Sequence, residues 1–343
     1  MQVRTFLAII FCFIVSVAGA QTIGGGSAYN FMKLPATPLL TALGGVNTSY
    51  TTNEVGLTAN NPALLNPGLH SQLGASFNSF LASIKTYSLT GAYEYEKWNT
   101  TFGGHIYFID YGSIPQTDAA GNVSGNFHPV DYVVQVSAAR QYLERWNYGA
   151  SLKFINSNYR LYKSSAIAVD FGVLYSDSSK KLYASLLAKN MGVQLKTYAG
   201  EGEDLPFDLE VGVTKRLTKA PLGFSVTAQN LHQFNTLYSD ESFDTANNLS
   251  TDKSFLNKLF NHFVVATHIY VGDNVEGTIG YNHLRRQDLN IGSSGNGLNG
   301  FSMGVRVKFS KLQILYARSS YQRNISYNQF GLNLKMDELS RRL

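Results

Sequence analysis

The sequence has a single cysteine among its 343 residues, no long hydrophobic run and few charged side chains. Cys12 lies in an N-terminal apolar stretch that we expect to be cleaved, so the mature chain would have no disulfide and no cysteine-based metal site. Beyond that stretch, no segment approaches the roughly 18 consecutive apolar residues of a transmembrane helix. Charged residues make up 15% of the chain, and its net charge of +5 is not clustered, which argues against nucleic-acid binding.

The first twenty residues are typical of a secretory signal peptide. Arg4 supplies the positive charge, and an apolar core follows from Phe6 to Val17. Small residues at Ala18 and Ala20 then form a cleavage site. We therefore assign residues 1–20 to a signal peptide that is cleaved after Ala20.

Aromatic residues and glycine are abundant, with 21 Tyr, 21 Phe and 31 Gly, and the mean hydropathy is only −0.11. Period-two alternation begins after residue 70 and continues almost to the C-terminus. In segment 85–97, for example, Tyr87, Leu89 and Tyr93 alternate with Ser88 and Thr90. Many short alternating segments, each with a weak hydropathy signal, are typical of a membrane β-barrel.

Fourteen such segments can be counted, and the even number agrees with bacterial single-chain barrels. Their expected bounds are 71–82, 85–97, 100–111, 129–142, 146–158, 165–176, 181–191, 206–217, 222–231, 262–272, 274–284, 300–309, 312–321 and 324–335. We predict an all-β fold: a 14-stranded antiparallel transmembrane barrel of the outer membrane over residues 71–335. Residues 336–343 would form a periplasmic tail.

The lengths of the connections support the same topology. The long ones are 112–128, 192–205, 232–261 and 285–299, and all four follow odd-numbered strands. Connections after even-numbered strands are tight turns. Outer-membrane barrels have short periplasmic turns and long external loops, whereas a soluble sandwich has no reason to sort its loops by parity.

The polar face of each segment would then line the lumen. The side chains expected to point inward carry charges of both signs: Glu94, Glu96, Asp170, Asp208, Glu210, His268, Glu276 and Arg306. Such a mixture suggests a salt-bridged, filled interior rather than an open pore.

Residues 21–70 lack the alternation and are rich in apolar residues, Gly and Pro. Gly44 and Gly45 follow an apolar run, and Asn61-Pro62-Ala63 begins a second one. We predict that this segment is a hatch that fills the barrel. Asn-Pro is a frequent turn initiator, so a structural role for Asn61, Pro62 and Ala63 is favoured over direct ligand contact.

The segment also resembles a known family. Tyr29 to Pro35 reads Tyr-Asn-Phe-Met-Lys-Leu-Pro, and it is followed by Ala42-Leu43-Gly44-Gly45 and by Asn61-Pro62-Ala63-Leu64-Leu65. This ordered set, just after a signal peptide, resembles the PorV/PorQ family of outer-membrane proteins. The resemblance implies a barrel built like the fatty-acid channel FadL, with an N-terminal hatch. Only the first forty or so mature residues match as motifs.

The resemblance implies a non-enzymatic role, without a cofactor, in the type IX secretion system. The protein would sit in outer-membrane lipid and hold a PorZ-like surface protein, beside PorU and PorV, in the complex that attaches cargo to lipopolysaccharide. Aromatic side chains in the long loops are then candidate partner contacts: Phe127, Tyr198, Phe243, Phe255 and Phe260. The last two lie on an expected short helix, capped by Asp252 or Ser254, that could instead pack onto the barrel mouth. The alternative function is a FadL-like channel for hydrophobic compounds.

Other motifs carry no convincing chemistry. Residues 295–300 match a dinucleotide-binding glycine pattern but run from a polar loop into a strand rather than a helix. Residues 250–253 and Ser326 match parts of a penicillin-binding serine site without its Lys-Thr-Gly element. His262 and His268 are six residues apart on one strand, too distant for one metal ion. We therefore predict no catalytic residue and no metal site.

Overall fold

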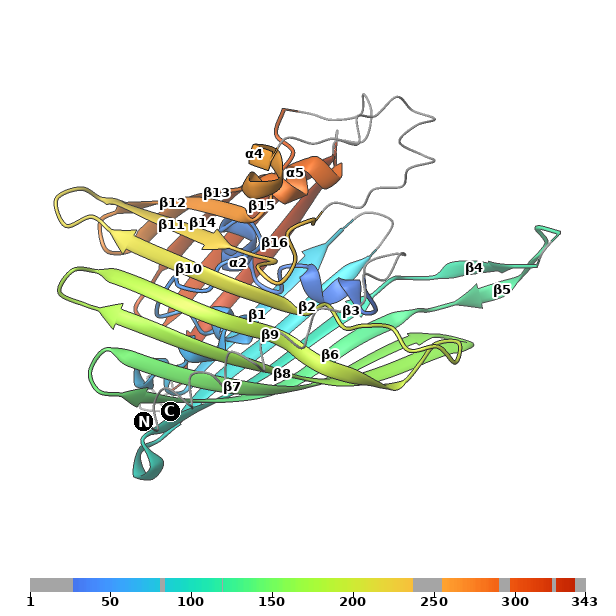
Figure 1. Ribbon diagram of the computed structural model, residues 1–343, viewed down its shortest axis with the longest axis horizontal. Coiled ribbons are helices and arrows are strands. Elements are labelled where there is room, and N and C mark those ends of the chain that lie inside the picture. The colour runs from blue at the N-terminus through green and yellow to red at the C-terminus, as the bar shows by residue number, and fades with distance from the viewer. Residues whose placement is uncertain are drawn as a thin grey trace, which may run out of the picture.

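The computed structural model describes residues 27–80, 84–118, 120–236, 255–289, 297–322 and 325–336. Within these residues, fourteen antiparallel strands close into one barrel, because β1 pairs with both β2 and the last strand, β16. The predicted fold class is confirmed (Figure 1). The barrel strands are β1 (Gln72–Ser79), β2 (Lys85–Tyr95), β3 (Thr100–Asp110), β6 (Val130–Tyr142), β7 (Trp146–Tyr159), β8 (Tyr162–Asp177), β9 (Leu182–Lys196), β10 (Asp208–Arg216), β11 (Leu222–Ala228), β12 (Phe263–Val271), β13 (Val275–Asn282), β14 (Phe301–Lys308), β15 (Leu312–Gln322) and β16 (Ile325–Lys335).

Burial alternates along the strands because successive side chains point to opposite faces. In β14, Met303 and Val305 are exposed on the outer surface, while Ser302, Gly304 and Arg306 are buried in the lumen. The outer surface is therefore apolar, and the inner surface is small and polar. This pattern is the inverse of a soluble protein and suits a barrel surrounded by lipid.

The connections are sorted by length, as predicted. Turns at one end of the barrel are tight, whereas the other end has the long loops, some with secondary structure of their own (Figure 1). These loop elements are the hairpin of β4 (Ile114–Thr117) and β5 (Val123–Phe127), helix α4 (Phe255–Phe260) and helix α5 (His283–Leu289). Among the described residues, no helix is long and apolar enough to cross a membrane.

Several details differ from the sequence-based expectations. Glu96 does not face the lumen: it is exposed in the turn η6 (Glu96–Trp98), where the left-handed conformation of Asn99 (φ 48°) reverses the chain. The segment expected as a strand to residue 284 ends at Asn282, whose side-chain oxygen accepts a hydrogen bond from the Arg285 amide (3.0 Å) and so begins helix α5. The hairpin in the loop 112–128 and helix α5 were not predicted.

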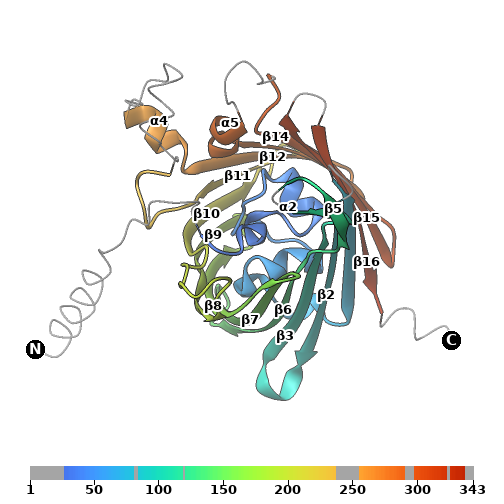
Figure 2. The same cartoon turned by 90° about the vertical axis from the view of Figure 1, so that its right-hand side faces the viewer.

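The N-terminal segment lies inside the barrel. Figure 2, which looks along the barrel, shows α2 surrounded by the ring of strands. We call residues 27–70 the plug. It consists of short helical turns joined by extended pieces: η1 (Asn30–Lys33), α2 (Pro38–Ala42), η2 (Val55–Ala59), η3 (Pro62–Leu64) and η4 (Pro67–Leu69). The predicted signal peptide, its cleavage site, Phe243, the helix-capping residues and the C-terminal tail beyond Met336 lie outside the described residues.

Candidate functional site

The plug folds through local caps that its sequence supplies. Pro38 begins α2, and the Thr37 hydroxyl before it accepts a hydrogen bond from the Leu40 amide (3.4 Å). The Asn61 side chain accepts one from the Ala63 amide (2.9 Å), which closes the turn η3 around Pro62. Asx and proline turns of this kind give the plug a compact shape without regular strands. The motif residues Asn61, Pro62 and Ala63 therefore form one buried turn.

At several positions of the barrel wall, a glycine leaves room for the plug. A Cβ atom added at Gly149 would lie 2.5 Å from the Pro62 carbonyl carbon, and one at Gly172 would lie 2.2 Å from the Asn61 side-chain oxygen. A Cβ at Gly280 would lie 2.4 Å from the Gly44 nitrogen. The strand glycines whose added Cβ would approach the plug within 3.1 Å are Gly74, Gly103, Gly149, Gly172, Gly212, Gly280, Gly304 and Gly331. We call them the wall glycines.

Because the wall glycines lie on β1, β3, β7, β8, β10, β13, β14 and β16, the plug contacts the wall around most of its circumference. At one side, Gly44 and Gly45 adopt positive φ angles (92° and 89°) just after α2. The Gly44 carbonyl oxygen accepts hydrogen bonds from Asn282 (3.2 Å) and Arg285 (2.8 Å). Helix α5 is thereby joined to the plug through Arg285.

Polar side chains of the wall bind the plug backbone elsewhere. Asn147 of β7 donates to the carbonyl oxygens of both Ala63 (2.7 Å) and Leu65 (2.6 Å). On the opposite side, the Asn53 carbonyl oxygen accepts from Gln313 (2.9 Å) and Asn333 (3.2 Å). Since carbonyl groups of an irregular segment have no ladder partners, these bonds satisfy groups that burial would otherwise leave unpaired.

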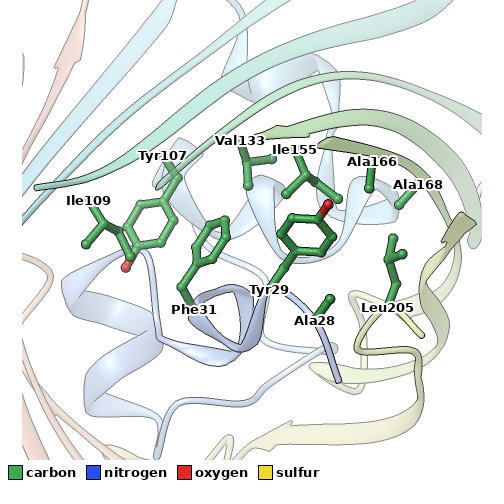
Figure 3. Packing of buried hydrophobic residues seen from close by; sticks show 10 residues of the cluster. All are labelled: Ala28, Tyr29, Phe31, Tyr107, Ile109, Val133, Ile155, Ala166, Ala168 and Leu205. Carbon is green, nitrogen blue, oxygen red and sulfur yellow. The ribbon is translucent and has the colours of Figure 1, made fainter. Parts of the chain in front are cut away.

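Apolar contacts complete the interface. The plug residues Ala28, Tyr29 and Phe31 pack against wall residues of β3, β6, β7 and β8 and against Leu205 (Figure 3). The wall residues of this cluster are Tyr107, Ile109, Val133, Ile155, Ala166 and Ala168. A second cluster joins Leu39, Leu43 and Leu57 of the plug to Leu174, Ala266 and Leu315 of the wall. The core of the protein thus lies between the plug and the wall.

Among the described residues, two groups of ion-paired side chains are buried in the lumen. Lys153 and Asp170 form an ion pair (2.7 Å), and both are almost inaccessible, at 3% and 0% exposure. Asp170 also accepts from the Asn190 amide (2.8 Å), which lies at an irregularity in the β8–β9 pairing. The second group joins Glu276 to Arg306 and to His268, and the Tyr50 hydroxyl of the plug donates to the same carboxylate. At these two places the buried charges neutralise one another, in line with the mixture of inward charges seen in the sequence.

The remaining internal space has both polar and apolar lining residues. A cavity of about 380 Å³ lies on the long-loop side of the plug, and its lining includes Lys33, Lys189, Asp208 and Glu210. A second cavity of about 390 Å³ lies at the short-turn end. An apolar groove of about 540 Å³ is found instead on the outer surface, where Phe77, Tyr87 and Phe330 are among its lining residues. Of the described residues, no group of three or more His, Cys, Asp or Glu is placed to hold a metal ion.

The candidate partner residues lie at the long-loop end but in different surroundings. Phe255 and Phe260 are 65% and 53% exposed on α4, and Phe127 is half-buried at the end of β5. Tyr198 is turned inward, with its ring 6.2 Å from that of Tyr29. Burial raises the pKa of the Tyr198 hydroxyl to about 12, and the nearby Asp131 carboxylate contributes to the increase. Tyr198 is therefore better placed to hold the plug than to meet a partner.

Sequence reasoning missed the wall glycines and Arg285. The glycines were visible as inward positions of alternating segments, but the partner that makes each one necessary is distant in sequence. Arg285 was assigned to a loop, whereas it also donates to Ser302 (3.2 Å) and Ser319 (2.9 Å) on the wall. The sequence does contain a signal for the helix that carries Arg285: Asn282 is a residue type that often caps the start of a helix.

Comparison with solved structures identifies the fold. A deletion variant of TodX, a monoaromatic hydrocarbon channel, matches with a TM-score of 0.50 at 12% identity, over 87% of this chain and 97% of that one. The monoaromatic hydrocarbon channel CymD matches with a TM-score of 0.50 at 13% identity, over 90% and 97%. The chain is an integral outer-membrane β-barrel. Its 14-stranded, FadL-like architecture is that of these channels. No family model and no curated protein matches the sequence.

Proposed function

We propose that this barrel is a non-enzymatic binding scaffold in protein secretion rather than an open pore. In this proposal it belongs to the type IX secretion system and holds a PorZ-like surface protein, beside PorU and PorV, in the complex that joins cargo to lipopolysaccharide. The observation that carries the proposal is the occupied lumen: the plug is bonded to the wall on opposite sides, through Asn147 and through Gln313 and Asn333. In a barrel whose lumen is filled in this way, the outer loops are the surface that can bind a partner protein.

Helix α4 is the most suitable partner surface among the described loops. Phe255, Leu256 and Phe260 are 65%, 58% and 53% exposed, and they lie on one short helix outside the ring of strands (Figure 2). Phe234 stacks against Phe255, with ring centroids 5.7 Å apart, and extends the apolar surface. Clustered exposed aromatics mark interaction sites, and aromatic residues dominate the binding energy of many interfaces. This arrangement favours partner binding by α4 over packing onto the barrel mouth.

The proposal predicts that the double variant Phe255→Ser/Phe260→Ser loses its surface partner. Losing two buried interface aromatics is expected to weaken binding by about 2 kcal/mol or more, which is roughly thirtyfold. We would isolate tagged protein from gently solubilised outer membranes and identify co-purifying proteins by mass spectrometry. The wild type should retain a large surface protein that the variant loses.

Leu161→Ser is the matched control, because Leu161 is 79% exposed in the β7–β8 turn at the same end of the barrel. It should retain the partner. Recovery of the wild-type barrel alone, with normal display of secreted cargo in cells that lack it, would reject the scaffold.

The fold comparison favours a second candidate, a channel for hydrophobic compounds, because TodX and CymD are channels of this architecture. At this low sequence identity, the shared fold does not carry function with it. The lining of the internal cavity is mixed, with Lys189, Asp208 and Glu210 beside apolar residues such as Leu34 and Phe207, whereas such a ligand needs a mostly apolar site. A channel would speed the uptake of a monoaromatic hydrocarbon such as toluene into cells that express the protein, whereas a scaffold would leave uptake unchanged.

A further inference from the structure

The cavity at the short-turn end combines the plug with the barrel wall. The plug contributes Tyr50, Thr51, Thr52 and Asn53, and the wall contributes residues of β9, β10, β12, β13 and β14 with the turns that join them. Its volume of about 390 Å³ lies within the range of small-ligand sites. By the loop-length rule of outer-membrane barrels, this end faces the periplasm. We call it the inner vestibule.

The inner vestibule carries an excess of positive charge. Its lining includes the cations Lys181, Arg216, Arg306 and Lys308, but only the acids Asp273 and Glu276. Glu276 is already engaged by Arg306, His268 and Tyr50. Asp273 therefore remains to balance three cations.

Those three cations are available for a ligand. Across the described ranges, no carboxylate lies within ion-pair distance of Lys181, Arg216 or Lys308. Arg216 instead lies over the ring of Tyr270, with its guanidinium carbon 4.0 Å from the ring centroid. Within the described part of the chain, the buried Nε of Arg306 also has no hydrogen-bond partner. Three cations without a carboxylate partner, beside a guanidinium that is 5% exposed, indicate an anionic ligand for this cavity.

The position of the inner vestibule indicates which kind of anionic ligand it binds, a lipid headgroup or an acidic peptide. Lipid headgroups surround the outer face of a barrel, whereas this cavity lies inside the wall and has plug residues as its floor. Tyr50, Tyr183 and Tyr270 add aromatic surface, which suits the stem of a side chain or a peptide rather than a bare ion. We propose that the inner vestibule binds an acidic peptide segment of a periplasmic protein through its carboxylates. This inference does not depend on the proposed function at the opposite end of the barrel.

Binding there would act on the plug. Arg306 donates to the Thr52 hydroxyl, and the next plug residue, Asn53, is held by Gln313 and Asn333 of the wall. A bound carboxylate would balance the excess positive charge beside this part of the plug. Because the site exists only in the folded protein, the ligand should also raise the midpoint of thermal unfolding.

The test uses the full mature protein in a neutral detergent and a rhodamine-labelled peptide of six glutamates, followed by fluorescence anisotropy. We expect saturable binding that weakens as salt is added, and none for a peptide of six glutamines. The triple variant Lys181→Gln/Arg216→Gln/Lys308→Gln should lose affinity about tenfold or more, since it removes several charge-assisted hydrogen bonds.

The matched control is Lys97→Gln/Arg140→Gln/Arg145→Gln, which removes the same charge from exposed positions at the same end but outside the vestibule. It should change the affinity less than about twofold, as expected for rim charges. Equal losses in both triple variants, or no binding by the wild type, would overturn the proposal. So would loss of peptide binding in nanodiscs that contain phosphatidylglycerol, because anionic lipid would then be the occupant. Circular dichroism would verify that each variant is folded.

Discussion

Gly280→Ala is expected to loosen the plug. The added Cβ would lie 2.4 Å from the Gly44 nitrogen, 2.5 Å from the Ala42 carbonyl oxygen and 2.6 Å from the Leu43 carbonyl carbon. These are backbone atoms of the plug, so no side-chain rotation can relieve the contact. Overpacking of this kind typically costs about 1–3 kcal/mol, which weakens the seating of the plug by the same amount and makes transient openings more frequent. The variant should unfold at a lower temperature and conduct ions in planar bilayers.

Gly277→Ala is the control for this experiment. Gly277 lies on the same strand, β13, but a Cβ there would meet nothing within 4 Å. Both substitutions remove the same backbone freedom from the unfolded chain, and only Gly280 faces the plug, so a larger loss of stability at Gly280 reports contact with the plug. If Gly280→Ala matched Gly277→Ala in thermal stability and in conductance, the plug would not be seated against this strand.

Much of the barrel could be predicted because a membrane imposes strong rules. A strand between lipid and a polar lumen must alternate, and all backbone groups must pair, so segment 85–97 was recognisable as the strand now seen at Lys85–Tyr95. The position of the long loops, each after an odd-numbered strand, then indicated which end of each strand faces outward. The inward acids Asp170, Glu210 and Glu276 were also placed correctly, because their position follows from the same alternation.

The parts that could not be predicted depend on contacts between distant residues. Alternation places Gly172 in the lumen, but only the fold shows that Asn61 of the plug occupies the space beside it. Strand β9 was expected to end near residue 191, yet it continues to Lys196 beyond an irregularity at Asn190, a non-glycine residue with φ 58°. Local propensity disfavours that conformation, and tertiary bonds stabilise it.

The Asp170 carboxylate accepts a hydrogen bond from the backbone at that irregularity, and Asp170→Asn should be among the most destabilising single changes. It would leave the Lys153 ammonium, only 3% exposed, without its counter-charge. Breaking one side of a buried ion pair typically costs about 3–5 kcal/mol. The substituted side chain would still offer a carbonyl oxygen to the Asn190 amide, but its NH2 group could not accept from Ser151, so a second variant must separate the charge from that hydrogen bond. Guanidinium unfolding in detergent, followed by tryptophan fluorescence, would measure it.

Two further variants make the result specific to the pair. Adding Lys153→Met to Asp170→Asn removes the stranded charge and should recover part of the stability, since paired replacement of a buried ion pair by neutral groups is often tolerated. Asp118→Asn, in the exposed β4–β5 turn, should leave the unfolding midpoint unchanged. Wild-type stability of Asp170→Asn would show that Lys153 is neutral or hydrated in the lumen. A double variant no more stable than Asp170→Asn would instead assign the loss to the hydrogen bonds of the carboxylate, including that from Ser151.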